Sequence, residues 1–180
     1  MKVAIIGAGS LGQSIAKGLL KNKVVSSLYL TRRNVDSIKE FNRYKAVTLT
    51  TENEEAVKNS DIILFAVQPR HLKDILENLK YKLNKEQVLI SVITGFSLGK
   101  IENIIGGKHF IIRAMPNTAT SVGQSMTCFS TNIKGKEKVE LAKTIFDSLG
   151  RSMVIPEDQL QAATVICASG IAFWMRLIRA

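Results

Sequence analysis

The stretch Lys2-Val3-Ala4-Ile5-Ile6-Gly7-Ala8-Gly9-Ser10-Leu11-Gly12 decides the fold. Lys2–Ile6 is an apolar run of strand length, and Ser10–Leu20 places apolar residues at helical spacing. Between them the pattern GxGxxG supplies one glycine for a tight turn, one for close approach of a pyrophosphate to the backbone, and one for close helix packing. The helix N-terminus then favours phosphates. The stretch predicts a dinucleotide-binding loop made of Gly7, Ala8, Gly9, Ser10, Leu11 and Gly12; the alternative is a glycine-rich structural turn.

Strands and helices alternate after this loop. The segments expected as strands are 27–31, 46–49, 61–67, 87–93 and 109–114, and those expected as helices are 35–41, 52–58, 70–79 and 98–105. The continuous apolar run within 61–67 is typical of a parallel strand that is buried on both faces. Segments 122–130, 136–149 and 152–155 are expected to add an edge strand, a helix and a last strand. The alternation predicts an α/β fold with a doubly wound, mostly parallel sheet.

The last segment, Glu157–Ala180, is expected to be one long helix with apolar residues on nearly every face. Such a helix must be covered by something. Polar residues at both ends leave fewer than the roughly 18 uninterrupted apolar residues that a membrane span needs, so no membrane is expected. The sequence stops inside this helix, which suggests a longer native chain or a subunit completed by another chain. The expected domains are 1–155 for the nucleotide and 156–180 for the start of a second domain.

Composition narrows the function classes further. The chain has 180 residues, 25 Lys+Arg against 15 Asp+Glu and a net charge of +10, but the basic residues are spread along it and aromatic residues make up only 6%. This distribution argues against a nucleic-acid partner and for a solvated surface that attracts anionic ligands. The two cysteines, Cys128 and Cys167, show no metal-ligand or disulfide-framework spacing, so free thiols are expected. The N-terminus lacks a secretory pattern, which favours the cytoplasm.

The end of the second expected strand discriminates between cofactors. Folds that bind NAD usually place a carboxylate about 20 residues beyond the glycine motif, where it bonds the ribose hydroxyls. Here that place holds Thr31, Arg32 and Arg33, followed by Asn34. Two guanidinium groups suit a 2′-phosphate, with which they form charge-assisted bidentate bonds. The sequence therefore predicts NADP(H) in preference to NAD(H); the alternative for the arginines is an exposed loop.

The chain resembles pyrroline-5-carboxylate reductases over its length from Lys2 to Ala180. The resemblance rests on Gly7–Gly12, Phe65–Pro69, Ile90–Gly95, Arg113–Thr118 and Ala168–Phe173, of which the run Met115-Pro116-Asn117-Thr118 is the most specific. It implies a Rossmann-type domain followed by the first helix of an all-α dimerisation domain, which interlocks with a partner in a homodimer or higher homo-oligomer. It also implies NADPH-dependent reduction of 1-pyrroline-5-carboxylate to L-proline, the last step of proline biosynthesis.

The same resemblance implies further site residues. Those expected along the dinucleotide are Asn53, Ala66, Val67, Gln68, Pro69, Val92, Ile93 and Thr94, and those expected near the nicotinamide are Met115, Asn117 and Thr118. Structural alternatives remain open for three of them: Asn53 as a helix cap, Pro69 as the first residue of a helix, and Asn117 as a turn residue. No metal site is expected. The histidines, His71 and His109, are expected to be structural.

Two departures from the family bear on the substrate. Ala168-Ser169-Gly170-Ile171-Ala172 stands where the family has Gly-Ser-Gly-Pro-Ala, and the family's segment for the substrate carboxylate lies beyond residue 180. We therefore expect this chain alone to bind cofactor and to turn over substrate poorly. One alternative is a β-hydroxyacid dehydrogenase-like enzyme or another imine reductase, although Glu157–Ala180 lacks the lysine expected of the former. Another is a non-catalytic NADP(H)-binding module.

Overall fold

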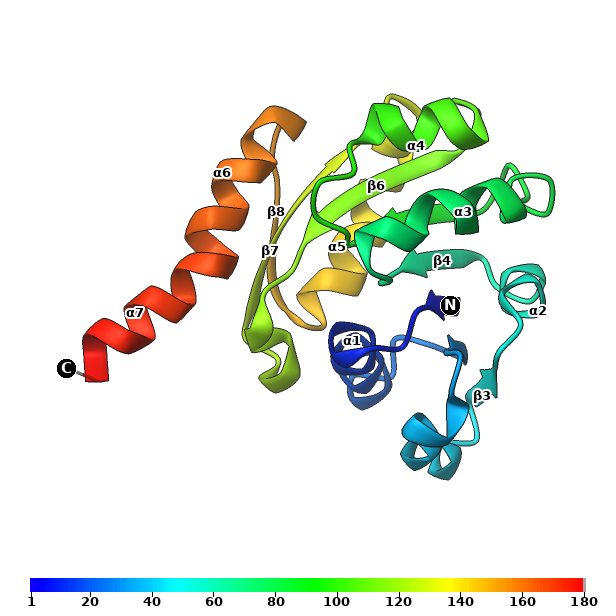
Figure 1. Cartoon of the computed structure of the whole chain (residues 1–180), viewed down its shortest axis with the longest axis horizontal. Helices are drawn as coiled ribbons and strands as arrows, with labels where there is room; N and C mark the ends of the chain where they lie inside the picture. The colour runs from blue at the N-terminus through cyan, green and yellow to red at the C-terminus, as the bar shows by residue number, and fades with distance from the viewer. Residues whose placement is uncertain (180) are drawn as a thin grey trace.

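An eight-stranded sheet runs through the molecule in the order β3-β2-β1-β4-β5-β6-β7-β8. The computed structural model describes residues 1–179 (Figure 1), so Ala180, the expected last residue of the final helix, lies outside the described residues. The strands are β1 (Lys2–Ile6), β2 (Ser27–Thr31), β3 (Val47–Thr50), β4 (Ile62–Phe65), β5 (Val88–Ser91), β6 (Phe110–Met115), β7 (Ser125–Thr131) and β8 (Gly150–Val154). All neighbouring pairs are parallel except β6 with β7. The mostly parallel sheet predicted from the sequence is therefore confirmed.

Helices cover both faces of the sheet, as a doubly wound fold requires. They are α1 (Ser10–Lys21), η1 (Val35–Arg43), α2 (Asn53–Lys58), α3 (Pro69–Leu79), α4 (Leu98–Ile105), η2 (Thr118–Val122), η3 (Lys134–Lys138) and α5 (Val139–Asp147). α1, η1 and α5 bury their apolar residues in one core, and α2, α3 and α4 bury theirs in the other. The spacing of Ile15, Ala16 and Leu19 puts these side chains on one face of α1, and burial of that face against the sheet stabilises the element.

The expected edge strand at 122–130 is wrong in its position in the sheet. β7 lies between β6 and β8, with Met115 opposite Cys128 on one side and Ser125 opposite Gly150 on the other. β8 is the edge strand, and its Met153 and Val154 are exposed. Gly150 permits this pairing because a Cβ there would lie 2.1 Å from the carbonyl oxygen of Ser125. The hydrophobic period predicts a strand but does not say which strand becomes its neighbour.

The final helix starts on the sheet and then leaves it. It consists of η4 (Glu157–Gln159), α6 (Leu160–Thr164), the π-helical η5 (Val165–Ser169) and α7 (Gly170–Arg179), drawn in orange and red in Figure 1. Leu160 is fully buried against Met115 on β6 and Cys128 on β7. In α7, by contrast, no described residue is buried. The cover expected for this helix is therefore missing over its second half.

By length and composition alone, this helix is also long and apolar enough to cross a membrane. Glu157–Arg179 has 23 residues and a mean hydropathy of 1.4 over its most apolar window. One such helix is weak evidence, because helices that pack in the core of soluble assemblies have the same composition.

Candidate functional site

A cleft of about 610 Å³ opens at the carboxyl ends of β1, β2 and β4. In sheets of this kind ligands bind outside the carboxyl ends of the strands, at the point where the strand order reverses, and β1 stands at that point between β2 and β4. The cleft is lined by Ile6, Gly7, Ala8, Gly9, Thr31, Arg32, Arg33, Asn34, Thr51, Asn53, Ala66, Val67, Gln68, His71, Asp74 and Ile75. Gly7, Ala8 and Gly9 of the predicted glycine loop thus line one cavity with the predicted arginine pair.

The glycines of the loop have different local roles. Gly7 has φ +95°, and a Cβ there would lie 2.5 Å from Val67 Cγ1, so this position requires glycine. A Cβ at Gly12 would lie 2.6 Å from the carbonyl oxygen of Gly7, which reflects the close packing of α1 against β1. A Cβ at Gly9 would meet nothing within 4 Å. Gly9 therefore leaves open space at the cleft wall, where a ligand can approach the backbone.

The N-terminus of α1 is suited to an anion. Gly9 is its N-cap residue, no side chain caps it, and its first turn contains no acidic residue. Backbone N–H groups in the first turn of a helix have no partner within the helix, and the helix dipole adds positive potential there. Ala8 donates its N–H to the carbonyl of Thr31, which holds the loop against the end of β2. The open space at Gly9 and this uncapped N-terminus fit the pyrophosphate of a dinucleotide.

The two arginines at the end of β2 are not equivalent. Arg32 is half-buried and donates from Nη1 to the carbonyl oxygen of Ala8 at 3.2 Å. Arg33 is exposed at the cleft. Asn34 accepts from the N–H of Asp36 at 3.0 Å and so caps η1. Arg32 therefore supports the loop itself, whereas the guanidinium of Arg33 is available to a ligand.

The opposite wall comes from α2 and α3. Pro69 is the first residue of α3 with Gln68 as its N-cap, so Pro69 does have the structural role that the sequence left open. Asn53 begins α2 but does not cap it: Glu52 is the N-cap residue, without a side-chain hydrogen bond. His71, Asp74 and Ile75 also line the cleft. Their i, i+3, i+4 spacing after Pro69 puts them on one face of α3, and this is the signal that could have identified them.

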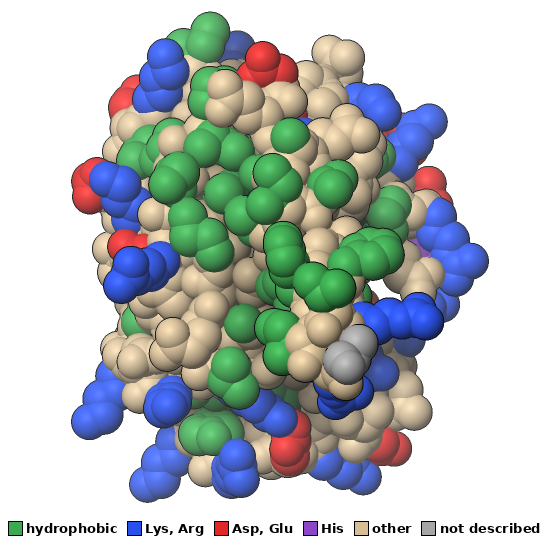
Figure 2. Space-filling model, turned by 90° about the vertical axis from the view of Figure 1, so that its left-hand side faces the viewer, with side chains coloured by type: hydrophobic (Ala, Val, Ile, Leu, Met, Phe, Trp, Pro, Cys, Tyr) green, Lys and Arg blue, Asp and Glu red, His purple; other side chains and the backbone are tan. Residues whose placement is uncertain are grey.

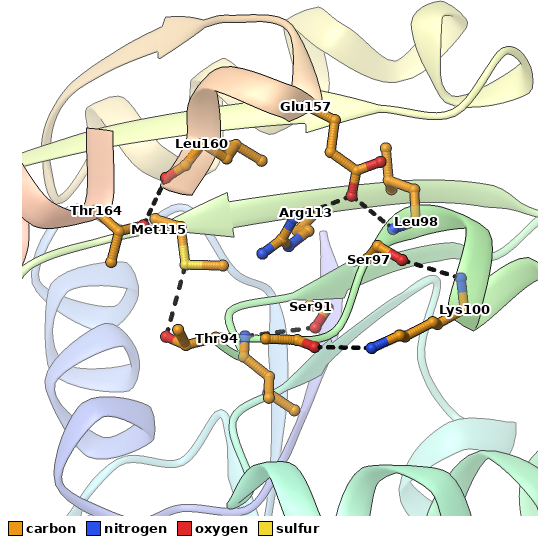
Figure 3. Close-up of polar contacts among 12 residues, drawn as sticks. Ser91, Thr94, Ser97, Leu98, Lys100, Arg113, Met115, Glu157, Leu160 and Thr164 are labelled. Carbon is orange, nitrogen blue, oxygen red and sulfur yellow. Dashed lines mark hydrogen bonds and ion pairs between the residues drawn. The ribbon is translucent and has the colours of Figure 1, made fainter. Parts of the chain in front are cut away.

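The remaining predicted site residues lie further along the same edge of the sheet. Val92 and Ile93 are buried after β5, and Met115 is buried at the end of β6. Figure 3 shows Thr94 and Met115 pointing toward each other, with Thr94 Oγ1 3.9 Å from Met115 Sδ. None of these residues, nor Ser10, Leu11, Gly12, Asn117 or Thr118, lines the cleft. The order β1-β4-β5-β6 places the ends of β5 and β6 beside the cleft, in the direction in which an extended dinucleotide would continue.

Asn117 is committed to the protein's own backbone. Its side chain accepts from the N–H of Ala119 at 3.0 Å and caps η2. Its Nδ2 donates to the carbonyl oxygen of Cys167 at 2.9 Å, and the residue is buried. Asn117 is therefore the turn residue that the sequence left open, and it also ties the final helix to the end of β6.

Glu157 makes two contacts that were not predicted from the sequence. Its Oε1 accepts from Arg113 Nη1 at 3.0 Å and from the N–H of Leu98 at 2.7 Å (Figure 3). Only 11% of the Arg113 side chain is exposed, so this ion pair is largely shielded from solvent. One carboxylate thus joins β6, the N-terminus of α4 and the start of the final helix. Within residues 1–179, no three His, Cys, Asp or Glu side chains are grouped as metal ligands.

The chain is similar to known proteins over nearly its whole length. The family model described as NADP oxidoreductase, coenzyme F420-dependent, matches residues 2–95. Pyrroline-5-carboxylate reductase 1 of Dictyostelium discoideum is 41% identical over 192 aligned residues. The structure of a pyrroline-5-carboxylate reductase from Coxiella burnetii has a TM-score of 0.91 at 29% identity, and the Plasmodium falciparum pyrroline carboxylate reductase, crystallised with NADP bound, has 0.87 at 26%.

Each of these alignments covers 99% of this chain but a smaller share of the other protein. The chain spans 35% of the Dictyostelium protein, 67% of the Coxiella chain and 66% of the Plasmodium chain. The resemblance to pyrroline-5-carboxylate reductases and the Rossmann-type fold with a long final helix are confirmed.

Proposed function

This chain belongs to the NADP oxidoreductase, coenzyme F420-dependent family, and on that premise we propose that it acts in the NADPH-dependent reduction of 1-pyrroline-5-carboxylate to L-proline. The observation that carries the proposal is the cleft in which the glycine loop, the uncapped N-terminus of α1 and Arg33 come together. The names of the similar proteins point to this substrate, and the Plasmodium relative holds NADP.

The proposed cofactor contacts follow the wall of the cleft. Gly7, Ala8 and Gly9 face the pyrophosphate, and the N–H groups of Ser10, Leu11 and Gly12 donate to it. Arg33, with Arg32 beside it, pairs with the 2′-phosphate, which NAD(H) lacks. Thr31, Asn53 and Ala66 to Pro69 border the adenosine half, and His71 and Asp74 join them. Val92 to Thr94, Met115, Asn117 and Thr118 border the nicotinamide half.

The chain's contribution to chemistry is alignment. Bound NADPH supplies a hydride from C4 of the nicotinamide. The acceptor is the carbon of a C=N bond, which accepts hydride best when its nitrogen is protonated, so the product is a secondary amine and no strong base is required. The loop and Arg33 hold the donor at one end, and the ends of β5 and β6 border it at the other. Fixing the donor in this way lowers the entropic cost of the step.

The Arg33 side chain gives the sharpest test of cofactor choice. Arg33→Ala removes one charge-assisted contact, worth about 1.5–3 kcal/mol, so affinity for NADPH should fall at least about tenfold. Affinity for NADH should not change. Arg151→Ala, which removes an exposed arginine from β8, is the matched control. Each variant is titrated with both cofactors. An equal loss of affinity for NADPH and NADH would show that Arg33 does not select the 2′-phosphate.

Turnover of pyrroline-5-carboxylate is measured with the native protein, because this chain alone is expected to turn over the substrate poorly. NADPH oxidation that depends on this substrate supports the proposed reaction. NADPH binding without turnover by the native protein would instead favour a non-catalytic NADP(H)-binding module.

The exposed side of α7 supports a proposal about assembly. Phe173, Trp174, Leu177 and Ile178 are all exposed, and Figure 2 shows hydrophobic side chains gathered on the face that carries this helix. A contiguous exposed apolar patch of this kind is typical of an interaction surface. A second copy of the chain, paired through the same helix, would cover it and give a homo-oligomer.

The cytoplasm is the proposed location, and cell fractionation tests it.

A further inference from the structure

The two cysteines of the chain lie on different elements, and the fold brings their side chains together. Cys128 is on β7 and is 5% exposed, whereas Cys167 is in η5 and is partly exposed. Both are free thiols, and the Cys167 thiol is near enough to Cys128 to raise the pKa of that thiol, beside the larger effect of burial. They are the only cysteines in the sequence, so this pairing has no competitor within the chain.

The geometry of the final helix accounts for this proximity. Leu160, Ala163 and Cys167 follow one another at helical spacing on the same side of the helix. Leu160 and Ala163 pack in one cluster with Cys128, so that side of the helix faces β7. The Asn117 side chain holds the carbonyl of Cys167 at 2.9 Å, which fixes the next turn as well. Ile166, one residue earlier, is 67% exposed and points away from the sheet.

We propose that Cys128 and Cys167 form an intramolecular disulfide when the protein meets a low-molecular-weight disulfide, and that this bond fastens the first half of the final helix to β7. The inference does not depend on the proposed function. It makes the attachment of the helix sensitive to the thiol–disulfide balance around the protein.

The exchange proceeds in two steps that balance. The thiolate of Cys167, the more exposed residue, attacks one sulfur of glutathione disulfide, forms a mixed disulfide and releases one glutathione thiolate. The Cys128 thiol then gives up its proton and attacks the Cys167 sulfur, which releases the second glutathione. Two protein thiols are oxidised, and one small disulfide is reduced to two thiols. Burial raises the pKa of the Cys128 thiol, which is a further reason for the exchange to begin at Cys167.

The test is to incubate the chain with glutathione disulfide and to follow its thiols and its mass. The expected product has lost both free thiols, is lighter by two hydrogens, runs as a single chain without reductant, and gives a peptide in which Cys128 and Cys167 are joined. Its melting temperature should be higher by about 5 °C than that of the reduced chain, because the bond restricts the unfolded state. Dithiothreitol should reverse both changes.

Two variants keep the test strict without altering the buried Cys128. Cys167→Ser should take up no stable modification under the same conditions. The double variant Cys167→Ser/Ile166→Cys moves the thiol to the exposed side of the helix, where it should stop at a glutathione adduct. The inference is overturned if the unaltered chain also stops at that adduct, if it forms only disulfides between chains, or if the moved thiol pairs with Cys128 equally well.

Discussion

Gly9 and Gly12 belong to the same loop, yet an added side chain has opposite consequences at each. At Gly9 the space beside the Cα is open and faces the cleft, and the backbone is extended with φ −76° and ψ −165°, which any residue adopts. At Gly12 a Cβ would collide with the backbone of Gly7. The first position therefore affects the ligand and the second affects the fold.

We expect Gly9→Val to retain the melting temperature and to lose measurable NADPH binding, because its side chain occupies the place of the pyrophosphate. Gly12→Ala is the counterpart, and it should lower the melting temperature by several degrees, since either the helix or the loop must shift. Calorimetric titration with NADPH and thermal unfolding followed by circular dichroism measure both effects. A folded Gly9→Val protein with unchanged NADPH affinity would place the dinucleotide elsewhere.

His109 should make stability depend on pH. It is buried just before β6, and its Nδ1 has no hydrogen-bond partner among residues 1–179. Burial lowers the pKa of His109, a backbone hydrogen bond with Asn84 opposes this, and the charges of Lys134 and Lys85 lower it further. The folded state therefore binds this proton less readily than the unfolded state does. The contribution of neutral His109 to the free energy of unfolding is therefore fully present above the pKa of about 6.5 that histidine has in the unfolded chain. This contribution is lost as the pH falls from that value toward the lower pKa of His109 in the folded chain.

Replacing His109 by Gln removes this proton-linked contribution. Urea unfolding at pH 7 and pH 5 should show a smaller loss of unfolding free energy in His109→Gln than in the unaltered chain. All other titrating groups are common to both proteins, so the difference between the two losses isolates His109. Identical losses would mean that the site accommodates the charged imidazole without cost.

At the scale of whole elements, the carboxylate of Glu157 determines how the final helix is attached. It accepts from the first N–H of α4 and pairs with Arg113 Nη1, whereas Arg113 Nε has no hydrogen-bond partner within residues 1–179. Removing one partner of a shielded ion pair leaves the other charge uncompensated, which costs more than the pair itself contributes. Because 30% of the Glu157 side chain is exposed, solvent offsets part of that cost.

Two substitutions separate the charge from the hydrogen bond. Glu157→Gln keeps an acceptor for Leu98 and should lower the unfolding free energy by about 1 kcal/mol, whereas Glu157→Ala removes both contacts and should lower it by about 2–3 kcal/mol. Asp158→Ala, at an exposed neighbouring position, should change it by less than about 0.5 kcal/mol. Denaturant unfolding measures all three. Equal values for the Gln and Ala variants would show that the hydrogen bond to Leu98 contributes nothing.

Local patterns predict the elements of this fold better than they predict its contacts. β1, β2 and α4 match their expected bounds, because each follows a clear apolar period between turn residues. The position of β7 inside the sheet was not predicted, because it depends on β8 pairing with the free side of β7. Gly7, Ala8, Gly9 and Arg33, which line the cleft, could be named from the sequence because their spacing is fixed within one strand-loop-helix-strand unit. His71 and Glu157 were missed because their roles depend on which elements pack against them, and no local pattern records that.

At the scale of the whole molecule, residues 1–179 leave the second half of the final helix uncovered. Exposing Phe173, Trp174 and Leu177 to water forgoes about 1.5–3 kcal/mol for each side chain, and pairing of two helices recovers much of it. The second half of the helix is free to pair because its first half is fixed to the sheet by Leu160, Glu157 and Asn117. Association should therefore leave the cleft unchanged.

We expect light scattering to show an oligomer for the unaltered chain, and a monomer that still binds NADPH for Phe173→Glu/Leu177→Glu, because two charges cannot be buried in an apolar contact without a partner. Ile133→Glu is the matched control: Ile133 is as exposed as the helix residues but lies on the connection between β7 and η3, so this variant should remain oligomeric. A monomeric unaltered chain would contradict the assignment of the helix as the interface. Dissociation by Ile133→Glu as well would show that the contact lies on another surface, and the apolar face of α7 would then need a different partner.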